Sequence, residues 1–230
     1  MKQTTFSPDL QARFAGFLYL IIIVAGGVGY SSGSNLVAWN DAAATARNIL
    51  ASEQVWRLGI AAMLLMLASD VALAVVFYAM FRPVSRVVAL YGMAFRLVMA
   101  AIIGAALIAR FAPAIVLHES HIEGADALAL ASIKLFEAGF NIALVFFGFD
   151  CLAIGWLIFK STFLPRMLGV LIALAGVCYL ANSFLNLVLP DLTVSFDVLL
   201  PAYVAELGLC LWLLLVGVNA TKWTALAQSG

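Results

Sequence analysis

Long apolar runs separated by short polar turns dominate the chain and predict a series of membrane-spanning helices. A span needs about 20 mostly apolar residues, and six stretches of the sequence meet that requirement. They cover residues 14–30, 56–81, 87–111, 140–159, 167–188 and 199–218. The sequence therefore predicts an all-α, polytopic membrane helix bundle with about six transmembrane helices, which form a single transmembrane domain over residues 1–230.

Two further segments are predicted to be helices that lie in the membrane interface. Residues 40–52 are amphipathic, with Asn40 or Asp41 as the N-cap and an apolar stripe of Ala46, Ile49 and Leu50. Residues 125–160 are helical in pattern, with Gly139 as the one breaker, but are too long for a single crossing. We therefore expect an interfacial portion, residues 125–138, that leads into the span at 140–159.

The basic residues are distributed unequally between the two sides of the predicted bundle. With the N-terminus inside, the cytoplasmic side holds Lys2, Arg13, Arg82, Arg86, Lys160, Arg166 and Lys222. The outer side holds only Arg47, Arg57, Arg110 and Lys134. The positive-inside rule predicts that this multi-pass protein has both termini in the cytoplasm.

Composition agrees with the hydropathy pattern and excludes some functions. Hydrophobic residues make up 65% of the chain and charged residues 10%, against about 45–50% and about 25% in soluble domains. The net charge of +0 gives no basic footprint for nucleic acid, so no nucleic-acid partner is expected. Cys151, Cys178 and Cys210 all lie in apolar runs without metal-ligand spacing, and we expect them to be small packing residues.

An acid and a base lie deep within two neighbouring spans. Asp70 is thirteen positions before Pro83 in the turn, and Arg96 is thirteen positions after it. Two helices that rise about 1.5 Å per residue place both charges at the same depth, so the two side chains are expected to pair. The small residues Gly92, Ala100 and Gly104 follow the face of Arg96 and allow a neighbouring helix to approach closely.

Two more acids, Asp150 and Glu206, are predicted to lie at a comparable depth. Three acids and one arginine leave a negative charge inside the membrane, so at least one acid is expected to be protonated or to bind a cation or an amine. Tyr78, eight positions after Asp70, adds a polar group to this candidate binding site. The alternative is that the ion pair only fixes helix packing and that neutral Glu206 accepts hydrogen bonds from Tyr or Asn groups.

A second polar group is expected nearer the outer surface. Glu137 and Asn141 share a helix face, as do Asn182 and Asn186, and Arg57 and Arg110 end two spans on the same side. These residues form a candidate vestibule that leads toward Arg96. The alternative is a set of interfacial salt bridges and hydrogen bonds between helices.

Other motifs predict little further chemistry. The histidines of His118-Glu119-Ser120-His121 have i, i+3 spacing in an acidic loop, which is weak for a metal site, so a solvated loop is favoured. The predicted spans contain no histidine and no lysine in mid-span, and the chain has no glycine-rich phosphate loop or Gly-x-Ser-x-Gly nucleophile. We therefore predict no cofactor, no metal and no assigned catalytic residue.

Several stretches resemble an uncharacterised bacterial membrane family, the domain of unknown function four-three-eight-six. They are RFAGFLYL (13–20), AAATARNILAS (42–52), RLGI (57–60), SDVALA (69–74), RPV (82–84), FNIALVFFGF (140–149) and FLPRMLGV (163–170). The resemblance covers nearly the whole chain and implies a small polytopic membrane protein without an established activity. Asp150 departs from the histidine or tyrosine associated with that position, so the resemblance implies no role for it.

Three functional hypotheses follow from these residues. The first is a protein that binds or transports a small ligand, ion or proton at Asp70, Arg96 and Glu206, with a cavity reaching one membrane face. The second is an accessory or scaffold subunit, as a homo-oligomer or in a membrane complex, with a dry and fully paired Asp70–Arg96 contact. The third is a membrane enzyme acting on a lipid-like substrate, with carboxylates that converge near a lipid-accessible groove.

Overall fold

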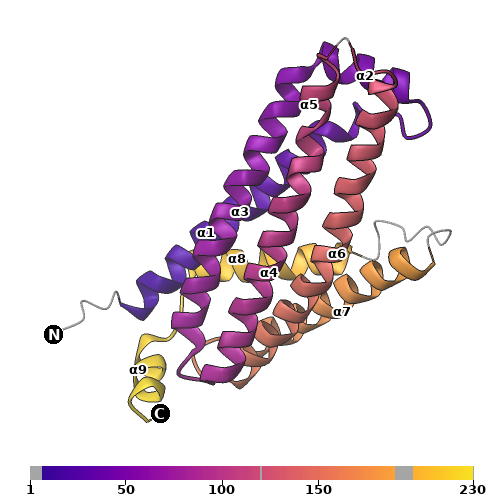
Figure 1. Ribbon diagram of the computed structural model, residues 1–230. Helices are drawn as coiled ribbons and strands as arrows, with labels where there is room; N and C mark the ends of the chain where they lie inside the picture. The colour runs from indigo at the N-terminus through magenta and orange to yellow at the C-terminus, as the bar shows by residue number, and fades with distance from the viewer. Residues whose placement is uncertain (1–6, 120, 190–198, 230) are drawn as a thin grey trace. The chain divides into compact units, whose positions relative to one another are not determined.

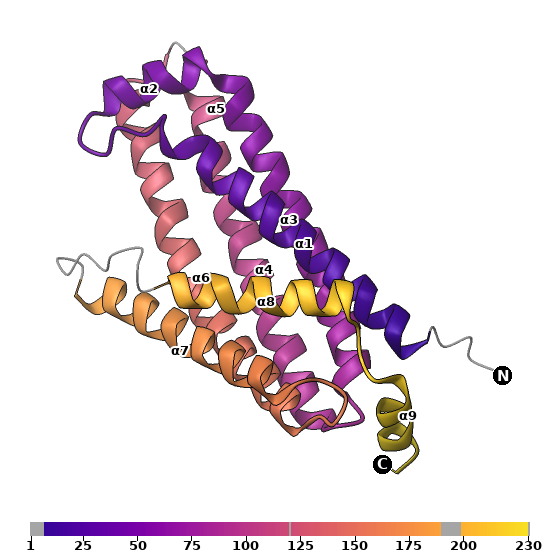
Figure 2. The ribbon, with the colours of Figure 1, turned by 180° about the vertical axis from the view of Figure 1, so that it is seen from behind.

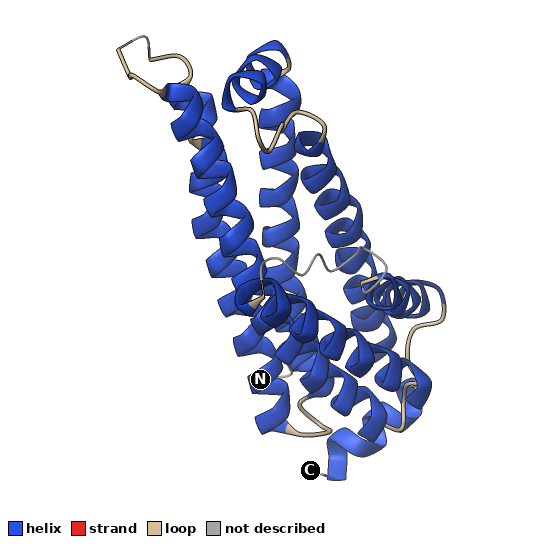
Figure 3. Ribbon diagram, turned by 90° about the vertical axis from the view of Figure 1, so that its right-hand side faces the viewer, coloured by secondary structure: helices blue, strands red, loops and turns tan. Residues whose placement is uncertain are grey.

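The computed structural model describes residues 7–119, 121–189 and 199–229, and all regular structure within them is helical (Figure 3). The helices are labelled in Figure 1. They are α1 (Pro8–Ser34), α2 (Ala42–Ala51), α3 (Glu53–Phe81), α4 (Arg86–Phe111), α5 (Pro113–Val116), α6 (Ala125–Lys160), α7 (Arg166–Val188), α8 (Leu200–Leu215) and α9 (Ala220–Ser229). The all-α prediction is confirmed.

Five of the predicted spans correspond to helices that are long and apolar enough to cross a membrane. They are α1, α3, α4 with α5, α6 and α7. The sixth prediction, residues 199–218, is too long: α8 has 16 residues and is followed by α9 at an angle of 94°. Gly217 lies in the bend with a φ of 77°, which favours glycine, and the Asn219 side chain accepts from the Lys222 N–H at the start of α9.

Helix α6 is one uninterrupted helix of 36 residues over the predicted range 125–160, and the division into an interfacial portion at 125–138 and a span at 140–159 stays a prediction. At about 1.5 Å per residue it is roughly 54 Å long, more than the apolar core of a bilayer. Gly139 does not break it. A Cβ at this position would lie 2.8 Å from the Ala106 Cβ, so the glycine permits close packing against α4.

Helix α2 forms where the amphipathic pattern predicts it. Asp41 is the N-cap, and its side chain accepts from the Ala44 N–H at 2.8 Å. Thr45, Ala46 and Ile49 are buried, whereas Leu50 is exposed, so Ala46 and Ile49 of the predicted stripe pack against the protein. The buried face of α2 packs near α5, which lies beside it in Figure 1.

The chain divides into two compact units, and each is described by itself. Unit 1 comprises Met1–Leu20, Ser69–Met99 and Leu144–Gly230, and unit 2 comprises Ile21–Ala68 and Ala100–Ala143. Helices α1, α3, α4 and α6 contribute residues to both units. All the buried acids of the predicted deep site, together with Arg96, belong to unit 1.

Glycines set the packing of α6 against α7 in unit 1. A Cβ on Gly148 would come within 3.0 Å of the Gly176 carbonyl oxygen, and one on Gly155 within 2.7 Å of the Gly169 oxygen. The two contacts are seven residues apart on each antiparallel helix, which is about two turns. Helix α8 then packs against α7, as Figure 2 shows.

Candidate functional site: a buried charge cluster

Arg96 lies between two carboxylates in the interior of unit 1. Its Nη1 is 2.7 Å from Asp70 Oδ1, and its Nη2 is 2.7 Å from Asp150 Oδ2. Its Nε donates to the same Asp150 oxygen at 2.8 Å. Asp70, Arg96 and Asp150 are 3%, 2% and 1% exposed. The predicted Asp70–Arg96 pair is therefore confirmed, and Asp150 is a second partner that the sequence did not reveal.

The helices that carry these charges approach closely because of small residues. Asp70 on α3 and Arg96 on α4 face each other across the turn at residues 82–85, as their equal spacing from Pro83 predicts. Gly92 lies one turn before Arg96, and a Cβ there would be 3.3 Å from Asp150 Oδ1. The glycine thus leaves room for the Asp150 carboxyl of α6.

Three aromatic rings surround the Arg96 guanidinium. Its Cζ lies 5.9 Å, 5.8 Å and 5.2 Å from the ring centroids of Tyr19, Phe77 and Phe147. Such contacts stabilise a cation away from water. The two carboxylates and the three rings together stabilise the buried guanidinium.

Phe77, and not the predicted Tyr78, joins this cluster from α3. At about 100° per residue, position i+7 lies about 20° from Asp70 around the helix axis, whereas i+8 lies about 80° away. Tyr78 is only partly buried, and no contact with the charge cluster is found for it among the described residues. Its assignment to the deep site is therefore corrected in favour of its neighbour.

Glu206 on α8 receives hydrogen bonds from two tyrosines. The Tyr19 hydroxyl donates to Oε2 at 3.2 Å, and the Tyr179 hydroxyl donates to Oε1 at 2.5 Å. Glu206 is 7% exposed, and no cation lies within ion-pair distance of it among the described residues. The expectation that Glu206 accepts hydrogen bonds from Tyr groups is confirmed, and its protonation stays a prediction.

The aromatic residues connect Glu206 to the ion pairs. Tyr19 donates to Glu206 and also presents its ring to Arg96. Tyr179 packs against Phe147 at a centroid distance of 5.0 Å, and Phe147 in turn contacts Arg96. The three acids, the arginine and these rings therefore form one continuous group, which we call the charge cluster (Asp70, Arg96, Asp150 and Glu206, with Tyr19, Phe77, Phe147 and Tyr179).

One carboxylate oxygen in the charge cluster is not satisfied. Both Arg96 nitrogens that reach Asp150 bond to Oδ2, and Oδ1 is buried without a hydrogen-bond partner in the described structure. A buried polar atom without a partner is costly. The unsatisfied atom belongs to Asp150 and not to the Asp70–Arg96 contact, so the expectation of a dry, fully paired Asp70–Arg96 contact stays a prediction.

Several residues of the predicted outer vestibule make hydrogen bonds within their own units, although Arg110 Nε is buried without a partner among the described residues. In unit 2, Tyr30 donates to the Glu137 carboxylate at 3.0 Å, and Asn141 donates to the Glu137 carbonyl at 3.0 Å. Arg110 donates to the Gly29 carbonyl. In unit 1, Asn182 is buried on α7. A vestibule that joins these residues remains a prediction.

The loop around the two histidines makes local contacts as well. His118 Nε2 lies 2.9 Å from Glu53 Oε2, and His121 Nδ1 lies 3.5 Å from Glu119 Oε2. Ser120 lies outside the described residues, as does Lys2 of the basic-residue comparison. Within the described parts of the chain, no three His, Cys, Asp or Glu side chains are grouped so as to hold a metal ion.

These features define the class of the protein: a polytopic membrane helix bundle with a buried cluster of ionisable side chains. The chain belongs to the family described as "Domain of unknown function (DUF4386)", whose model matches residues 14–217. This confirms the resemblance seen in the sequence.

An uncharacterized protein of Archaeoglobus fulgidus is similar to this chain, with 31% identity over 122 residues. That alignment covers 53% of this chain and 63% of the relative, so the chain spans somewhat less than two thirds of the relative's length. No solved structure matches the chain. The comparisons thus establish the family, and the chemistry has to be argued from the charge cluster.

Proposed function

We propose that this membrane protein binds a proton at its charge cluster and belongs to the class of small-solute, ion or proton binders and transporters. The observation that carries the proposal is the excess of acids: three carboxyl groups and one guanidinium are all at most 7% exposed. The proton is the ligand we assign first, because it needs no preformed cavity.

Charge balance is the first argument. If Asp70, Asp150 and Glu206 were all ionised, the charge cluster would carry two negative charges more than Arg96 neutralises. An isolated charge in a low-dielectric interior costs far more than a paired one, and the usual relief is to take up a proton. The two aspartates share Arg96, whereas Glu206 receives bonds only from neutral phenols.

The donor set favours a proton over a divalent cation. Asp70 Oδ1 and Asp150 Oδ2 are already engaged by Arg96. This leaves Asp70 Oδ2, Asp150 Oδ1 and the two Glu206 oxygens as acceptors, fewer than the six or more oxygens that Ca²⁺ and Mg²⁺ require. A change of protonation at Glu206 reaches Arg96 through Tyr19, which contacts both, and this would couple the proton to the packing of the helices.

Infrared difference spectroscopy on the purified protein in lipid tests the proposal. A protonated carboxylic acid has a carbonyl stretch that an ionised carboxylate lacks, so the band reports protonation directly. We expect such a band at neutral pH, its loss on raising the pH, and its absence or marked reduction in Glu206→Gln. The matched control is Glu123→Gln, which removes an exposed acid outside unit 1 and should leave the band unchanged.

Two results would count against proton binding. One is a spectrum without any protonated carboxyl band in the pH range where the protein is folded. The other is a band that persists unchanged in Glu206→Gln, Asp150→Asn and Asp70→Asn alike. Either result, together with a protein partner that co-purifies with all of these variants, would favour the accessory-subunit hypothesis.

The proposal includes an orientation in the bacterial inner membrane with both termini in the cytoplasm. It rests on the excess of basic residues at the turns that carry Arg82, Arg86, Lys160 and Arg166. Reporter fusions test it: a C-terminal fluorescent protein that folds only in the cytoplasm should be bright, and a C-terminal alkaline phosphatase should be inactive. The opposite pair of results would reverse the orientation.

A further inference from the structure

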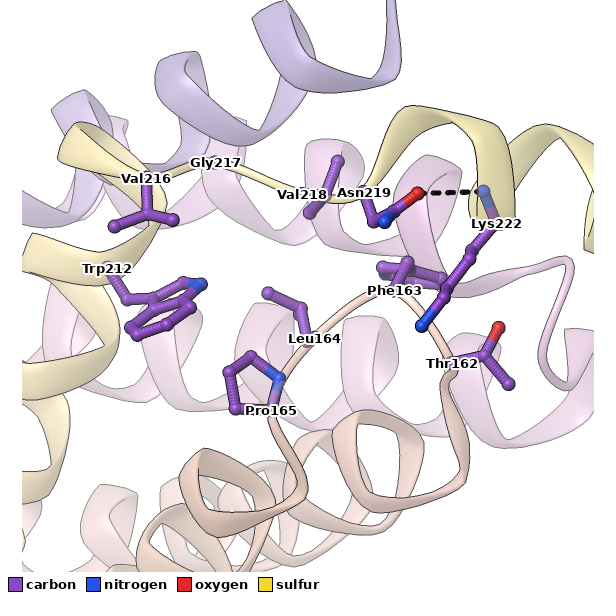
Figure 4. Close-up of a pocket in the computed structure, with 10 residues that line it drawn as sticks. All are labelled: Thr162, Phe163, Leu164, Pro165, Trp212, Val216, Gly217, Val218, Asn219 and Lys222. Carbon is purple, nitrogen blue, oxygen red and sulfur yellow. Dashed lines mark hydrogen bonds between the residues drawn. The ribbon is translucent and has the colours of Figure 1, made fainter.

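A pocket of about 450 Å³ lies in unit 1 where the α6–α7 turn meets the bend between α8 and α9 (Figure 4). Its walls come from residues 162–165 of the turn and from Trp212, residues 216–219 and Lys222. We propose that this elbow pocket binds the phosphate-bearing headgroup of an anionic phospholipid. The site is separate from the charge cluster, none of whose residues line the pocket.

The walls of the elbow pocket are held together by specific contacts. The Asn219 N–H donates to the Phe163 carbonyl at 3.1 Å, which joins the bend to the α6–α7 turn. The Trp223 indole N–H donates to the Met80 carbonyl at 2.8 Å and fixes α9 against the end of α3. Phe163 also stacks on Phe81 of α3. The pocket is therefore built into the packing of this end of unit 1.

The pocket has a polar side and an apolar side. The Lys222 side chain extends from α9 toward the turn near Thr162 (Figure 4), and both residues are exposed. Lys222 has no ion-pair partner among the described residues. Trp212, Leu164 and Val216 form the opposite, apolar side. The Lys222 ammonium and the Thr162 hydroxyl can bind the phosphate of a phospholipid, while the apolar side of the pocket contacts its acyl chains.

Basic side chains outnumber acidic ones at the end of unit 1 that contains the pocket. The α3–α4 turn, the α6–α7 turn, the start of α1 and α9 bring six basic side chains to this end of unit 1: Arg13, Arg82, Arg86, Lys160, Arg166 and Lys222. Apart from the charge cluster, Asp9 is the only acid among the described residues of unit 1; its carboxylate lies beside Gly217 of the pocket wall and is paired with Arg13 at 2.9 Å. Basic side chains outnumber this acid at the pocket's end of unit 1, and this balance of charge favours an anion.

Exposed apolar side chains beside the pocket favour a lipid over free phosphate as the bound anion. Met167, Leu215 and Val216, next to or within the pocket wall, are 68%, 67% and 55% exposed, which is expected of side chains that face acyl chains. Basic pockets at the ends of membrane helices bind anionic headgroups, with about 1 kcal/mol for each Lys or Arg at the surface. One lysine removed from the site then corresponds to about a fivefold loss of affinity.

Native mass spectrometry of the delipidated full chain, titrated with phosphatidylglycerol or with phosphatidylcholine of the same acyl chains, tests the proposal. We expect tighter binding of phosphatidylglycerol and about a fivefold loss in Lys222→Gln. Arg86→Gln is the comparison variant: Arg86 is an exposed cation at the same end of unit 1 that does not line the pocket, so its replacement should lower the affinity clearly less than Lys222→Gln does. Circular dichroism establishes that both variants are folded.

Three outcomes would overturn the elbow pocket as a lipid site. Equal binding of the two lipids would show that charge does not select the ligand. Equal losses in Lys222→Gln and Arg86→Gln would show a diffuse basic surface without a pocket. Displacement of phosphatidylglycerol by inorganic phosphate at similar concentrations would show that the site takes phosphate alone. None of these results bears on proton binding at the charge cluster, so the two proposals fail separately.

Discussion

Replacing Arg96 by glutamine should be the most destabilising single change in the charge cluster. The substitution removes the only cation among the described residues that pairs with Asp70 and Asp150, together with the bonds at 2.7 Å, 2.8 Å and 2.7 Å that it makes to them. Removal of one partner from a buried ion pair costs about 3–5 kcal/mol, because the remaining charge stays buried without compensation. Here two carboxylates are left, so the upper part of this range is expected.

Asp70→Asn should cost much less. The asparagine carbonyl oxygen can still accept from Arg96 Nη1, and Arg96 keeps both of its bonds to Asp150. A bond to a charged group contributes about 1.5–3 kcal/mol and a neutral one about 0.5–1.5 kcal/mol, so the expected loss is about 1–2 kcal/mol. The structure therefore changes the expectation for a simple pair, in which either single substitution would be equally harmful.

The decisive comparison is a triple variant, Asp70→Asn with Arg96→Gln and Asp150→Asn. It removes all three charges and leaves amide groups that can bond to one another. Replacement of a complete buried ion group by neutral residues is often nearly without cost, so the triple variant should be more stable than Arg96→Gln alone. Additive effects predict the reverse order, which makes the sign of the difference the critical result.

Reversible unfolding in mixed detergent micelles, followed by circular dichroism, measures these free energies. Arg166→Gln is the control: Arg166 is exposed and stacks on Phe159 at 5.7 Å, so its loss should cost below about 1 kcal/mol. If Arg96→Gln costs no more than Arg166→Gln, or if the triple variant is the least stable of all, then the charges in the cluster are not energetically coupled. An uncompensated buried charge would then not be what destabilises Arg96→Gln.

Two further predictions concern packing and capping. Gly155→Ala should destabilise the protein by about 1–3 kcal/mol, because the new Cβ would lie 2.7 Å from backbone atoms of α7. Gly27→Ala, where a new Cβ has nothing within 4 Å, should be neutral or slightly stabilising. Equal melting temperatures for the two variants would contradict the close approach of α6 and α7. Asp41→Ala should cost about 0.5–2 kcal/mol by removing the N-cap of α2, and Asp41→Asn should retain most of the stability in the same melt.

Much of this architecture follows from the sequence because membrane helices are defined by composition and length. The apolar runs identify the long helices, and Asp41 and the following residues identify α2. The predicted span at 199–218 extends past the end of α8, because a hydropathy pattern does not show a bend. Val216 and Val218 are apolar, but Gly217 between them turns the chain into α9. Hydropathy also could not distinguish Gly139 as a packing residue from a helix breaker.

The sequence predicts how deep the charged residues of the cluster lie in the membrane, but not toward which neighbouring helix each side chain points. Equal spacing from Pro83 places Asp70 and Arg96 at one level, which suffices for two helices joined by a tight turn. For Asp150 the same reasoning predicts the depth in the membrane, but not that its side chain lies on the side of α6 that faces Arg96. Tyr19 and Tyr179 lie within apolar runs in which aromatic residues are common, and only their position opposite Glu206 marks them. Contacts between sequence-distant helices therefore contain the missing information.

The charge cluster combines two tasks that the substitutions can separate. Arg96 holds α3, α4 and α6 together through Asp70 and Asp150, so its removal must affect stability whatever the function is. Glu206 contacts no cation among the described residues. In Glu206→Gln the amide oxygen can accept from one tyrosine hydroxyl and the amide N–H can donate to the oxygen of the other, so the exchange removes a titratable group with little structural consequence. A scaffold protein would be indifferent to that exchange. A proton-binding protein would keep its fold and lose its response to pH, and the difference between Arg96→Gln and Glu206→Gln therefore distinguishes the two hypotheses.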